Sequence, residues 1–458
     1  MKPTNNVALK FCLLAAALVL PAQSAFAKVT AAKAAELDGP KYTCIGAERA
    51  GSASGIPAYT GKYVGTWPGQ SKPFGYEPGP YAAEKPKFTI TSDNFSQYAD
   101  KMSEGQKALL KKYPKSFRMN VYESHRDFGN PPWVCDVIKK NAVTAEVVHD
   151  GLGVTGTTGA IPFPFPASGL EAIWNGINPY RAVTEQAVTD IADVYANGSI
   201  AWGRNKFMTY NPSNDATKRG SYQDKINSYF FTSYLLPERD KGFTAVGYQP
   251  NDFSKDATAS WQYSPGIRRV RQAPAVGFDY PVPPAGLRTV DDDYGFNGSP
   301  ERYTWKLIGK KEVYVPYHNF KINDPAIKYS DLIKPETINP EYVRYELHRV
   351  WVLEGNLKKG VRHIYSRRTL YLDEDSWATV WSDAYDGRGQ LWRANFINYF
   401  YSQESSAFHR GVSVYHDLTS GAYEAGYLVN ERGKDWWRIN LPMKPSQFSP
   451  EAAARGGH

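Results

Sequence analysis

Cysteine is scarce in this chain, which has three cysteines among 458 residues. The chain therefore cannot be a disulfide-rich scaffold. Cys12 lies in a short apolar segment near the N-terminus, without the small neighbours of a lipid-attachment site. Cys44 and Cys135 remain, and in an oxidising compartment an isolated pair is more often a disulfide than a metal site or a nucleophile. We expect a Cys44–Cys135 bond that fastens an N-terminal arm to the body and stabilises it by roughly 3–5 kcal/mol through chain entropy.

Common catalytic and metal-binding patterns are also missing. The eight histidines show no H-x-x-x-H or H-x-H spacing, and no G-x-S-x-G elbow occurs, since Ala53 stands at the centre of the 51–55 run. Residues 151–156 match G-x-G-x-x-G, but a proline-rich segment follows where a nucleotide-binding turn needs a helix. These glycines indicate a turn, and the sequence predicts no cofactor.

The first 27 residues predict export. Lys2 and Lys10 form a charged region, Phe11 to Leu20 an apolar core, and Ala25-Phe26-Ala27 a cleavage site. This arrangement is typical of a secretory signal peptide, and its core is too short to span a bilayer. We expect a periplasmic protein, either free in the periplasm or attached peripherally to the outer membrane.

The formal charge is +8, with two of the cations in the predicted leader, and the sequence pI is about 9.0. A basic protein can bind nucleic acid, but these cations are scattered and export argues against that partner. Contact with anionic lipid head groups or phosphorylated glycolipid fits the charge equally well.

The high aromatic content, with 12 Trp and 32 Tyr, favours a β-rich protein. From about residue 187 the alternation of apolar and polar residues predicts closely spaced antiparallel strands. The predicted strands are 187–194, 200–210, 227–236, 244–249, 257–263, 267–272, 303–317, 343–353, 362–372, 377–385, 391–401, 412–417 and 422–429, with earlier ones at 117–123 and 142–149. The fold class is mainly β with a few helices, a curved sheet or open barrel with one apolar and one wet face.

The chain divides into a signal peptide (1–27), an extended Gly/Pro/Tyr-rich arm (28–90) and a single curved-sheet domain (91–458). Thr91 or Ser92 can cap a helix over about 92–113, which Pro114 ends. Ser168 and Glu171 form a capping box for a second helix over 168–178, and the apolar, proline-rich segment 161–166 leads into it. The long loops 273–300 and 318–341 are candidates for a lid or rim.

Several groups of charged residues are candidates for metal-binding or catalytic sites. Residues 291–298 resemble the start of a calcium loop, but Arg302 stands where the final acid belongs, which leaves an acidic turn or a casual surface cation site. His348 and His363 could approach across strands near Glu346, although solvent-facing histidines are the simpler interpretation. The pairs Asp373/Asp375 and Asp383/Asp386 are typical of hairpin turns, and nothing selects one as a glycosidase dyad. The sequence therefore predicts no metal site and no catalytic residue.

The stretch from Trp261 to Arg271 is a strand, a Pro-Gly turn and a second strand rich in arginine. With 98–106, 161–175, 303–309 and 383–393, it resembles the DUF1329 family and, beyond it, the outer-membrane lipoprotein-sorting (LolA/LolB-like) superfamily. The resemblance covers nearly all of the chain after the leader. It implies a half-open barrel whose helices cover a concave face that holds acyl chains.

From this resemblance we expect a non-catalytic periplasmic protein that binds or transfers a lipid or other hydrophobic ligand. The alternating aromatics suit a ligand cavity or an ordinary core. The candidate ligand-binding residues are Trp174, Trp261, Tyr263, Trp305, Tyr345, Leu347, Trp351, Arg268 and Arg269. The segment 161–178 would form part of the lid, and an outer-membrane porin-like protein or an efflux-type permease is a possible partner. The alternatives are an accessory subunit of such a complex and a carboxylate-based hydrolase of envelope glycans or lipids.

Overall fold

The computed structural model describes residues 29–60, 75–218, 226–273, 278–433 and 437–456. The predicted signal peptide therefore lies outside the described residues. Within those ranges, no helix has both the length and the apolar character that crossing a bilayer requires.

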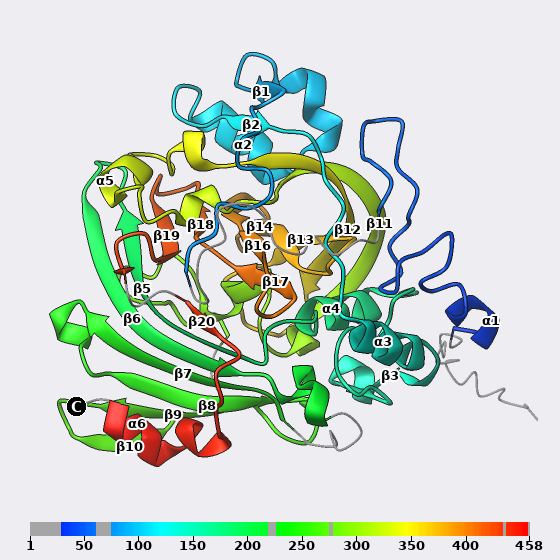
Figure 1. The fold of residues 1–458 in the computed structure, drawn as a ribbon. Helices are drawn as coiled ribbons and strands as arrows, with labels where there is room; N and C mark the ends of the chain where they lie inside the picture. The colour runs from blue at the N-terminus through cyan, green and yellow to red at the C-terminus, as the bar shows by residue number, and fades with distance from the viewer. Residues whose placement is uncertain (1–28, 61–74, 219–225, 274–277, 434–436, 457–458) are drawn as a thin grey trace, which may run out of the picture.

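A curved, open sheet of sixteen strands forms most of the molecule (Figure 1). Its order is β1-β2-β12-β13-β14-β15-β18-β19-β5-β6-β7-β8-β9-β10, with β11 beside β12 and β20 beside β5. Neighbouring strands are antiparallel, except for a single parallel bridge between β2 and β12. The strands are β1 (Phe88–Ile90), β2 (Met119–Val121), β5 (Thr184–Val194), β6 (Ile200–Tyr210), β7 (Ile226–Leu236), β8 (Thr244–Pro250), β9 (Ala259–Ser264), β10 (Arg269–Gln272), β11 (Tyr303–Pro316), β12 (Tyr345–Leu357), β13 (Arg367–Asp373), β14 (Thr379–Tyr385), β15 (Leu391–Phe396), β18 (Ser413–Asp417), β19 (Tyr423–Leu428) and β20 (Arg438–Ile439).

Two short hairpins stand apart from this sheet. One consists of β16 (Tyr399–Ser402) and β17 (Ala407–Arg410), the other of β3 (Glu146–Val148) and β4 (Gly153–Thr155). The predicted fold class, mainly β with a strongly curved antiparallel sheet, is confirmed.

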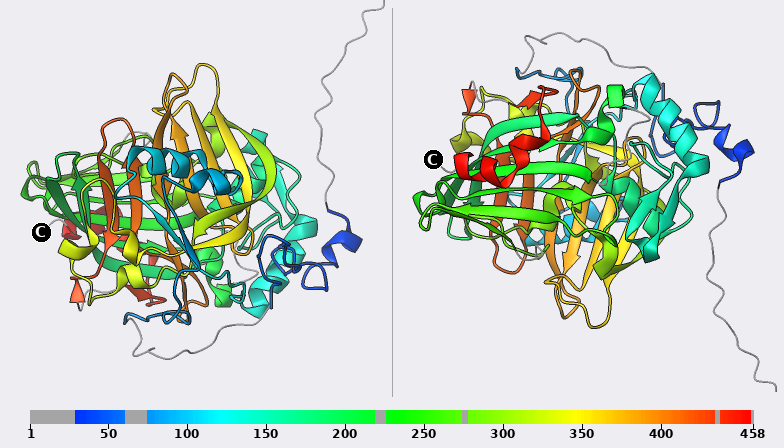
Figure 2. Two further views of the ribbon diagram at one scale, coloured as in Figure 1. Left: turned by 90° about the horizontal axis from the view of Figure 1, so that it is seen from above. Right: turned by 90° about the horizontal axis from the view of Figure 1, so that it is seen from below.

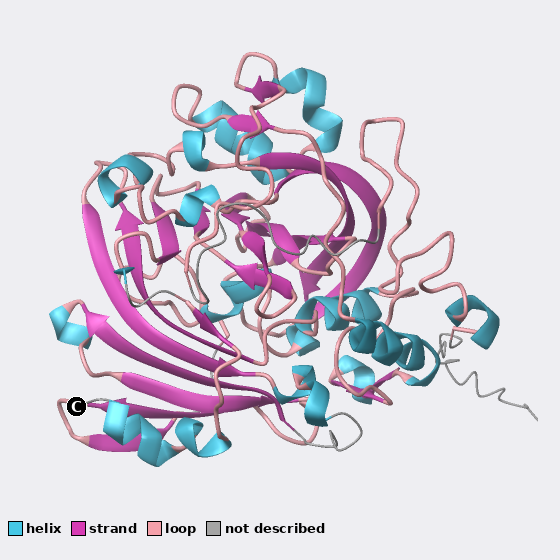
Figure 3. Cartoon of the chain, in the orientation of Figure 1, coloured by secondary structure: helices cyan, strands magenta, loops and turns pink. Residues whose placement is uncertain are grey.

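The helices lie around the sheet rather than between its strands (Figure 3). α4 (Gly169–Ile177) packs against β11 and β12, α2 (Glu104–Lys112) against β14 and β15, and α6 (Pro450–Gly456) against β8, β9 and β10. α1 (Ala31–Ala34) contacts α3 (Pro132–Thr144), and α5 (Tyr329–Leu332) is a single turn. The views from above and below place α2 and α6 at different sides of the sheet (Figure 2).

Ser168 starts α4 as predicted, because its hydroxyl accepts a hydrogen bond from Glu171 N at 3.2 Å. The predicted continuous helix over 92–113 is wrong. A 3₁₀ helix, η1 (Phe95–Lys101), is separated from α2 by extended backbone at Met102. Ser103 and Gln106 form a capping box there, each side chain accepting from the other's backbone N–H at 3.0 Å, which begins a new helix.

The predicted strand over 142–149 is also wrong at its start, because α3 runs through Thr144 and only Glu146–Val148 is strand. Pro132 occupies the first turn of α3, where the missing N–H of proline costs nothing. Val134, Val137 and Ile138 face a core cluster that also contains Cys44. Pro132 thus begins a helix whose inner face belongs to the core.

The N-terminal arm is held against the body, as predicted. Cys44 and Cys135 form a disulfide that joins the arm to α3 across 91 residues of sequence. Ile45, Ala47 and Ile56 of the arm are buried.

The face of β12 that the sequence predicts to be exposed to solvent is buried. Glu346 and His348 are 0 % and 1 % exposed, and Arg344 is also buried. Tyr345 and Leu347 belong to one core cluster, whereas Trp351 and Leu353 belong to another. Both sides of this strand are therefore covered, and buried ion pairs rather than solvent receive its charged side chains.

Candidate ligand-binding cavity

The register of strands β6 to β9 places alternate side chains on one face of the sheet. Phe207 on β6 lies opposite Thr232 on β7, which lies opposite Ala245 on β8, which lies opposite Gln262 on β9. This row and its neighbours line a cavity of about 410 Å³, within the range of small-molecule sites. The lining residues from these strands include Asn205, Phe207, Thr209, Ser228, Phe230, Thr232, Tyr234, Ala245, Gln249, Ser260 and Gln262.

The segment 278–297 forms the opposite wall, with Phe278, Val282 and Phe296 among the lining residues. The sheet holds this segment close. Asp193 accepts a hydrogen bond from Ala285 N at 2.6 Å, and Arg239 donates to Pro284 O at 2.8 Å. Gly203 permits the approach, because a β-carbon there would lie 2.9 Å from Pro284 Cδ. The predicted long loop 273–300 thus supplies a wall of the cavity over its described part.

One corner of the cavity is charged. Arg181, Arg288 and Arg410 line it together with Asp293 and Tyr294. Asp293 comes from the 3₁₀ helix η6 (Val290–Gly295), whose backbone turns into the left-handed region at Tyr294, and Arg410 ends β17. Arg410 Nη1 lies 2.9 Å and Arg288 Nη1 3.1 Å from Asp293 Oδ1.

These charges shift one another's pKa values. Although burial opposes it, Arg410 and Arg288 hold the pKa of Asp293 below its usual value. Behind Arg288, Glu424 accepts from its Nε at 2.6 Å. Burial, reinforced by the charge of Glu424, raises the pKa of Asp193 to about 8, so this carboxyl is largely protonated at neutral pH.

The predicted ligand-binding tryptophans lie elsewhere. Trp261 and Tyr263 belong to a cluster with Phe448 and Ala453, on the face of β9 that α6 covers. Trp174 donates its indole N–H to Gly151 O at 3.0 Å and packs with Phe163.

The remaining predicted residues are likewise outside the cavity lining. Trp305 donates to Pro300 O at 2.9 Å, and Trp351 stacks on Trp377. Tyr345 and Leu347 lie in the main core cluster. Arg268 and Arg269 are exposed at the β9–β10 turn. The structure therefore brings Trp305 and Trp351 together in one cluster but unites none of these residues at the cavity.

Sequence reasoning missed the cavity residues because they are the polar partners in the alternation. Ser260 and Gln262 alternate with Trp261 and Tyr263, and the sequence prediction assigns the aromatic pair to the ligand-binding face. The usable signal was the run Ser228-Tyr229-Phe230-Phe231-Thr232, in which apolar residues point to both faces and both must be covered. No pattern in the sequence singles out Arg181 or Arg410.

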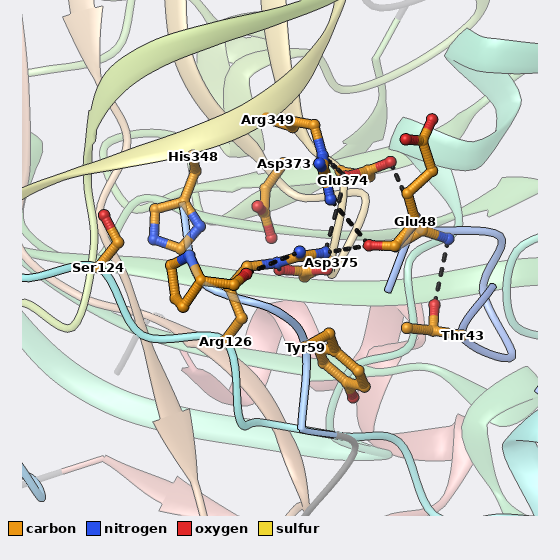
Figure 4. A network of polar contacts seen from close by, with 12 residues as sticks. Thr43, Glu48, Tyr59, Ser124, Arg126, His348, Arg349, Asp373, Glu374 and Asp375 are labelled. Carbon is orange, nitrogen blue, oxygen red and sulfur yellow. Dashed lines mark hydrogen bonds and ion pairs between the residues drawn. The ribbon is translucent and has the colours of Figure 1, made fainter. Parts of the chain in front are cut away.

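The acid pair Asp373/Asp375 and His348 lie in a different region, a buried network that anchors the arm (Figure 4). Arg126 donates to both carboxylate oxygens of Asp375, at 2.7 and 2.8 Å, and to Glu48 O and Pro57 O of the arm. Glu374 accepts from Arg349, from Lys310 and from Glu48 N. Asp373 and Asp375 lie at the turn between β13 and β14, as predicted, but both are buried. Asp375 pairs there with Arg126, and Asp373 accepts from the hydroxyls of Tyr317 and Ser376.

His348, Asp373 and Asp375 offer ligand atoms within 4.8 Å of one another, a spacing that a metal ion could use. The guanidinium group of Arg126, however, already donates a hydrogen bond to each carboxylate oxygen of Asp375. Burial and the neighbouring Asp375 raise the pKa of Asp373 to about 6, while Arg126 lowers that of Asp375 against its burial. None of the three lines the cavity.

The other candidate metal-binding groups of the sequence analysis are also buried. His363 Nε2 lies 3.0 Å from Asp291 Oδ2, and Arg368 donates to the same oxygen at 2.8 Å. Asp291 and Asp292 are each 1 % exposed, so the suggested surface cation site is wrong. His348 contacts Glu346 at 3.1 Å, and the prediction of solvent-facing histidines fails for both. Within residues 151–156, Gly151 ends the 3₁₀ turn η2 (His149–Gly151), as predicted for a turn, whereas Gly153–Thr155 form strand β4.

Comparison with known proteins gives a family and a set of similar folds. The family model described as "Protein of unknown function (DUF1329)" matches residues 89–454. An uncharacterized protein of Pseudomonas aeruginosa, PA3922, is 39% identical over 451 residues, covering 96% of this chain and 97% of that protein.

Three solved structures are similar at low sequence identity. A DUF1329 family protein from Desulfovibrio piger has 13% identity and a TM-score of 0.40, covering 59% of this chain and 92% of its own. A putative outer membrane lipoprotein-sorting protein domain from Vibrio parahaemolyticus has 12% identity, a TM-score of 0.40 and the same coverages. A LolA superfamily protein from Nitrosomonas europaea has 10% identity and a TM-score of 0.37, covering 63% of this chain and 100% of its own. At this degree of likeness they carry no argument about function.

Proposed function

The chain belongs to the DUF1329 family, described as being of unknown function, and we propose that it binds and transfers a hydrophobic ligand in the periplasm. The observation that carries this proposal is the cavity of about 410 Å³ between strands β6–β9 and the segment 278–297. A well-packed protein interior has few voids larger than a water molecule, so a space of this size is unusual and is large enough for a small ligand.

The composition of the wall supports an apolar ligand. Six phenylalanines line the cavity: Phe207, Phe230, Phe231, Phe243, Phe278 and Phe296. Moving an acyl chain from water onto such a surface is favourable by about 25 cal/mol for each Å² of apolar area removed from water. Neutral polar groups such as Gln249 and Gln262 are interspersed, and they can orient a ligand without opposing its burial.

Binding of this kind needs no covalent step. Transfer would require only that the cavity open toward a partner, with burial of apolar ligand surface as the driving force. The predicted leader and the Cys44–Cys135 disulfide support an oxidising envelope compartment. An outer-membrane porin-like protein or an efflux-type permease remains the proposed partner. If a pull-down with this protein recovers such a channel, and the protein carries no small ligand, the accessory-subunit alternative is favoured.

A carboxylate-based hydrolase is the catalytic alternative. The pKa values of Asp373 and Asp375 are pushed apart, as an acid–base pair requires. Both side chains are nevertheless enclosed with Arg126 under the arm, away from the cavity. We therefore propose a non-catalytic role, under which Asp373→Asn leaves ligand binding unchanged. Hydrolysis of an envelope glycan or lipid ester by the wild type, lost in Asp373→Asn, would reverse this assignment.

Native mass spectrometry of protein purified without detergent tests the proposal. The wild type should retain a lipid-sized ligand or, once stripped, accept one molecule of palmitate or lysophospholipid. Ala245→Phe places a ring in the cavity and should abolish this binding, because Ala245 lines the cavity in the middle of the sheet, on β8 between Thr232 and Gln262. Ala196→Phe, the same change at an exposed turn, is the matched control and should bind normally. A wild type that neither retains nor accepts any lipid contradicts the proposal.

A further inference from the structure

We propose that the ligand of this cavity is a single-chain amphiphile with an anionic head group, and that Arg181 and Arg410 bind the head. This inference rests on the proposed function and adds the class of ligand. The chemistry shared by a carboxylate and a phosphate head is a set of anionic oxygens that accept hydrogen bonds from guanidinium groups.

Arg410 carries hydrogen-bond donors that the protein does not use. Its side chain is 3 % exposed and lines the cavity, yet its Nε has no hydrogen-bond partner among the described residues. Its Nη1 lies near Asp293 Oδ1, but that one oxygen also receives Arg288 Nη1 and the Tyr427 hydroxyl. A single carboxylate oxygen thus serves three groups, and the buried guanidinium is left with donors to spare.

Arg181 repeats this arrangement on the same corner. Its Nε is buried and has no hydrogen-bond partner within the part of the chain that the structure describes. Its guanidinium lies 3.8 Å from the ring centroid of Tyr294, and Arg410 lies 4.1 Å from the same centroid. The two arginines therefore converge on Tyr294 from different elements, each with an unused Nε–H.

The charge balance of the lining favours an anion. Among the described lining residues, three are cationic (Arg181, Arg288 and Arg410), whereas Asp293 is the one acid. Glu185 is buried and does not line the cavity, but His409, Arg410 and Arg181 hold its pKa below its usual value against the effect of burial, and its Oε1 is 3.4 Å from His409 Nδ1. Glu424 is engaged by Arg288, and the raised pKa of Asp193 makes that carboxyl a weak competitor. An incoming carboxylate or phosphate would bring anionic oxygens to the lining itself, where Asp293 is the one acid among the described residues.

The rest of the lining suits the tail. Apart from the corner residues, the described lining of the cavity is uncharged, and Phe230, Phe243, Phe278 and Val282 lie in it. A ligand with one anionic end and one apolar end matches this division. A neutral hydrocarbon would leave the two unused arginine donors without acceptors.

The first test compares ligands on the stripped wild-type protein. We expect palmitate to bind at least about 10-fold more tightly than hexadecanol, a difference of about 1.4 kcal/mol. Lysophosphatidic acid compared with a monoacylglycerol provides the phosphate arm, and the stronger of the two preferences identifies the head. Equal affinities for anionic and neutral members of both pairs would overturn the head-group assignment but leave the proposed function standing. Absence of binding by all four compounds would instead contradict the proposed function.

The second test locates the preference. Arg181→Met should reduce the palmitate-to-hexadecanol ratio to near 1, and Arg181→Lys should restore part of it because a positive charge remains. Arg388→Met, at an exposed turn, is the matched control and should keep the wild-type ratio. An unchanged ratio in Arg181→Met, or an equal loss of both ligands, would overturn the proposed role of Arg181. If Arg181→Met does not fold, the ligand comparison on the wild type and Arg181→Lys still decides the question.

Discussion

The two halves of the sheet treat their interior in opposite ways. In the half that contains β12 to β19, charges are buried as mutual partners: Glu346 alone contacts Arg344, His318, His348 and the backbone N–H of His125. In the half that contains β6 to β9, a cavity of about 410 Å³ separates the sheet from segment 278–297, and Arg181, Arg288 and Arg410 line one corner of it. We infer that the first half holds the fold together and the second holds the ligand.

This division explains why the arm is fastened where it is. The disulfide, Arg126 and Arg349 all tie residues 44–57 to the packed half, beside β12 and β13. The cavity half carries α6 on its other face and has no such connection to the arm among the described contacts. Changes in the packed half should therefore reduce stability, and changes at the cavity should alter binding.

The largest effect is expected at Arg126. Arg126→Met leaves Asp375 as a buried carboxylate without its cation, which typically costs about 3–5 kcal/mol. Urea denaturation of this variant, with Arg388→Met as the exposed control, measures the change in the free energy of unfolding. A loss below about 1 kcal/mol would show that the network does not stabilise the packed half.

The disulfide should come next. Cys44→Ser with Cys135→Ser removes a link that closes a 91-residue separation, for which the typical measured loss is about 2–4 kcal/mol. Ligand affinity of the folded fraction should be unchanged, because neither cysteine lines the cavity. A loss of affinity without a loss of stability would contradict the separation of the two halves.

Acid should weaken the packed half through His416. Burial lowers the pKa of His416 from 6.5 to about 4, so the unfolded chain binds this proton first as pH falls. Its contribution is therefore complete above pH 6.5 and is lost as the pH falls through 4, by about 3 kcal/mol in total. His416→Gln should flatten the dependence of the unfolding free energy on pH in this window. Parallel profiles for the two proteins would refute the assignment.

A pair of identical substitutions gives the smallest but most specific contrast. Ala394 is fully buried beneath α2, and Ala394→Phe should destabilise the protein by about 1–3 kcal/mol through overpacking. Ala245→Phe points into free space and should change stability by less than about 0.5 kcal/mol while abolishing ligand binding. Thermal and urea unfolding of both variants decide this, and equal destabilisation would mean that the cavity half is packed like the other.

The sequence predicted the strands of the cavity half well, because 200–210, 227–236 and 244–249 are rich in the aromatic and β-branched residues that favour strands. It could not predict which face of those strands is hollow. That depends on α6, a short C-terminal helix that covers Trp261 and Tyr263 from the other side. Alternation defines two faces, whereas tertiary packing decides which of them meets a helix.

The buried ion network was also beyond sequence reasoning. Glu346, His348 and Asp373 alternate with apolar residues, as the residues of a solvated face would. Arg126 pairs with Asp375 across 249 residues of sequence. Nothing in the local sequence distinguishes such a paired charge from a charge in solvent. The disulfide was predictable because two cysteines allow a single pairing. The cavity arginines come from three distant segments, and only the fold unites them.

The position of a bound ligand tests the central claim most directly. A fatty acid brominated at its tail can be soaked into crystals of the protein and located by anomalous scattering. The account predicts one bromine peak inside the cavity, near Phe230 and Phe278, with the carboxylate density at Arg181 and Arg410. A bromine peak outside the space between β6–β9 and segment 278–297, or an empty cavity in crystals of protein that binds the acid in solution, would contradict it.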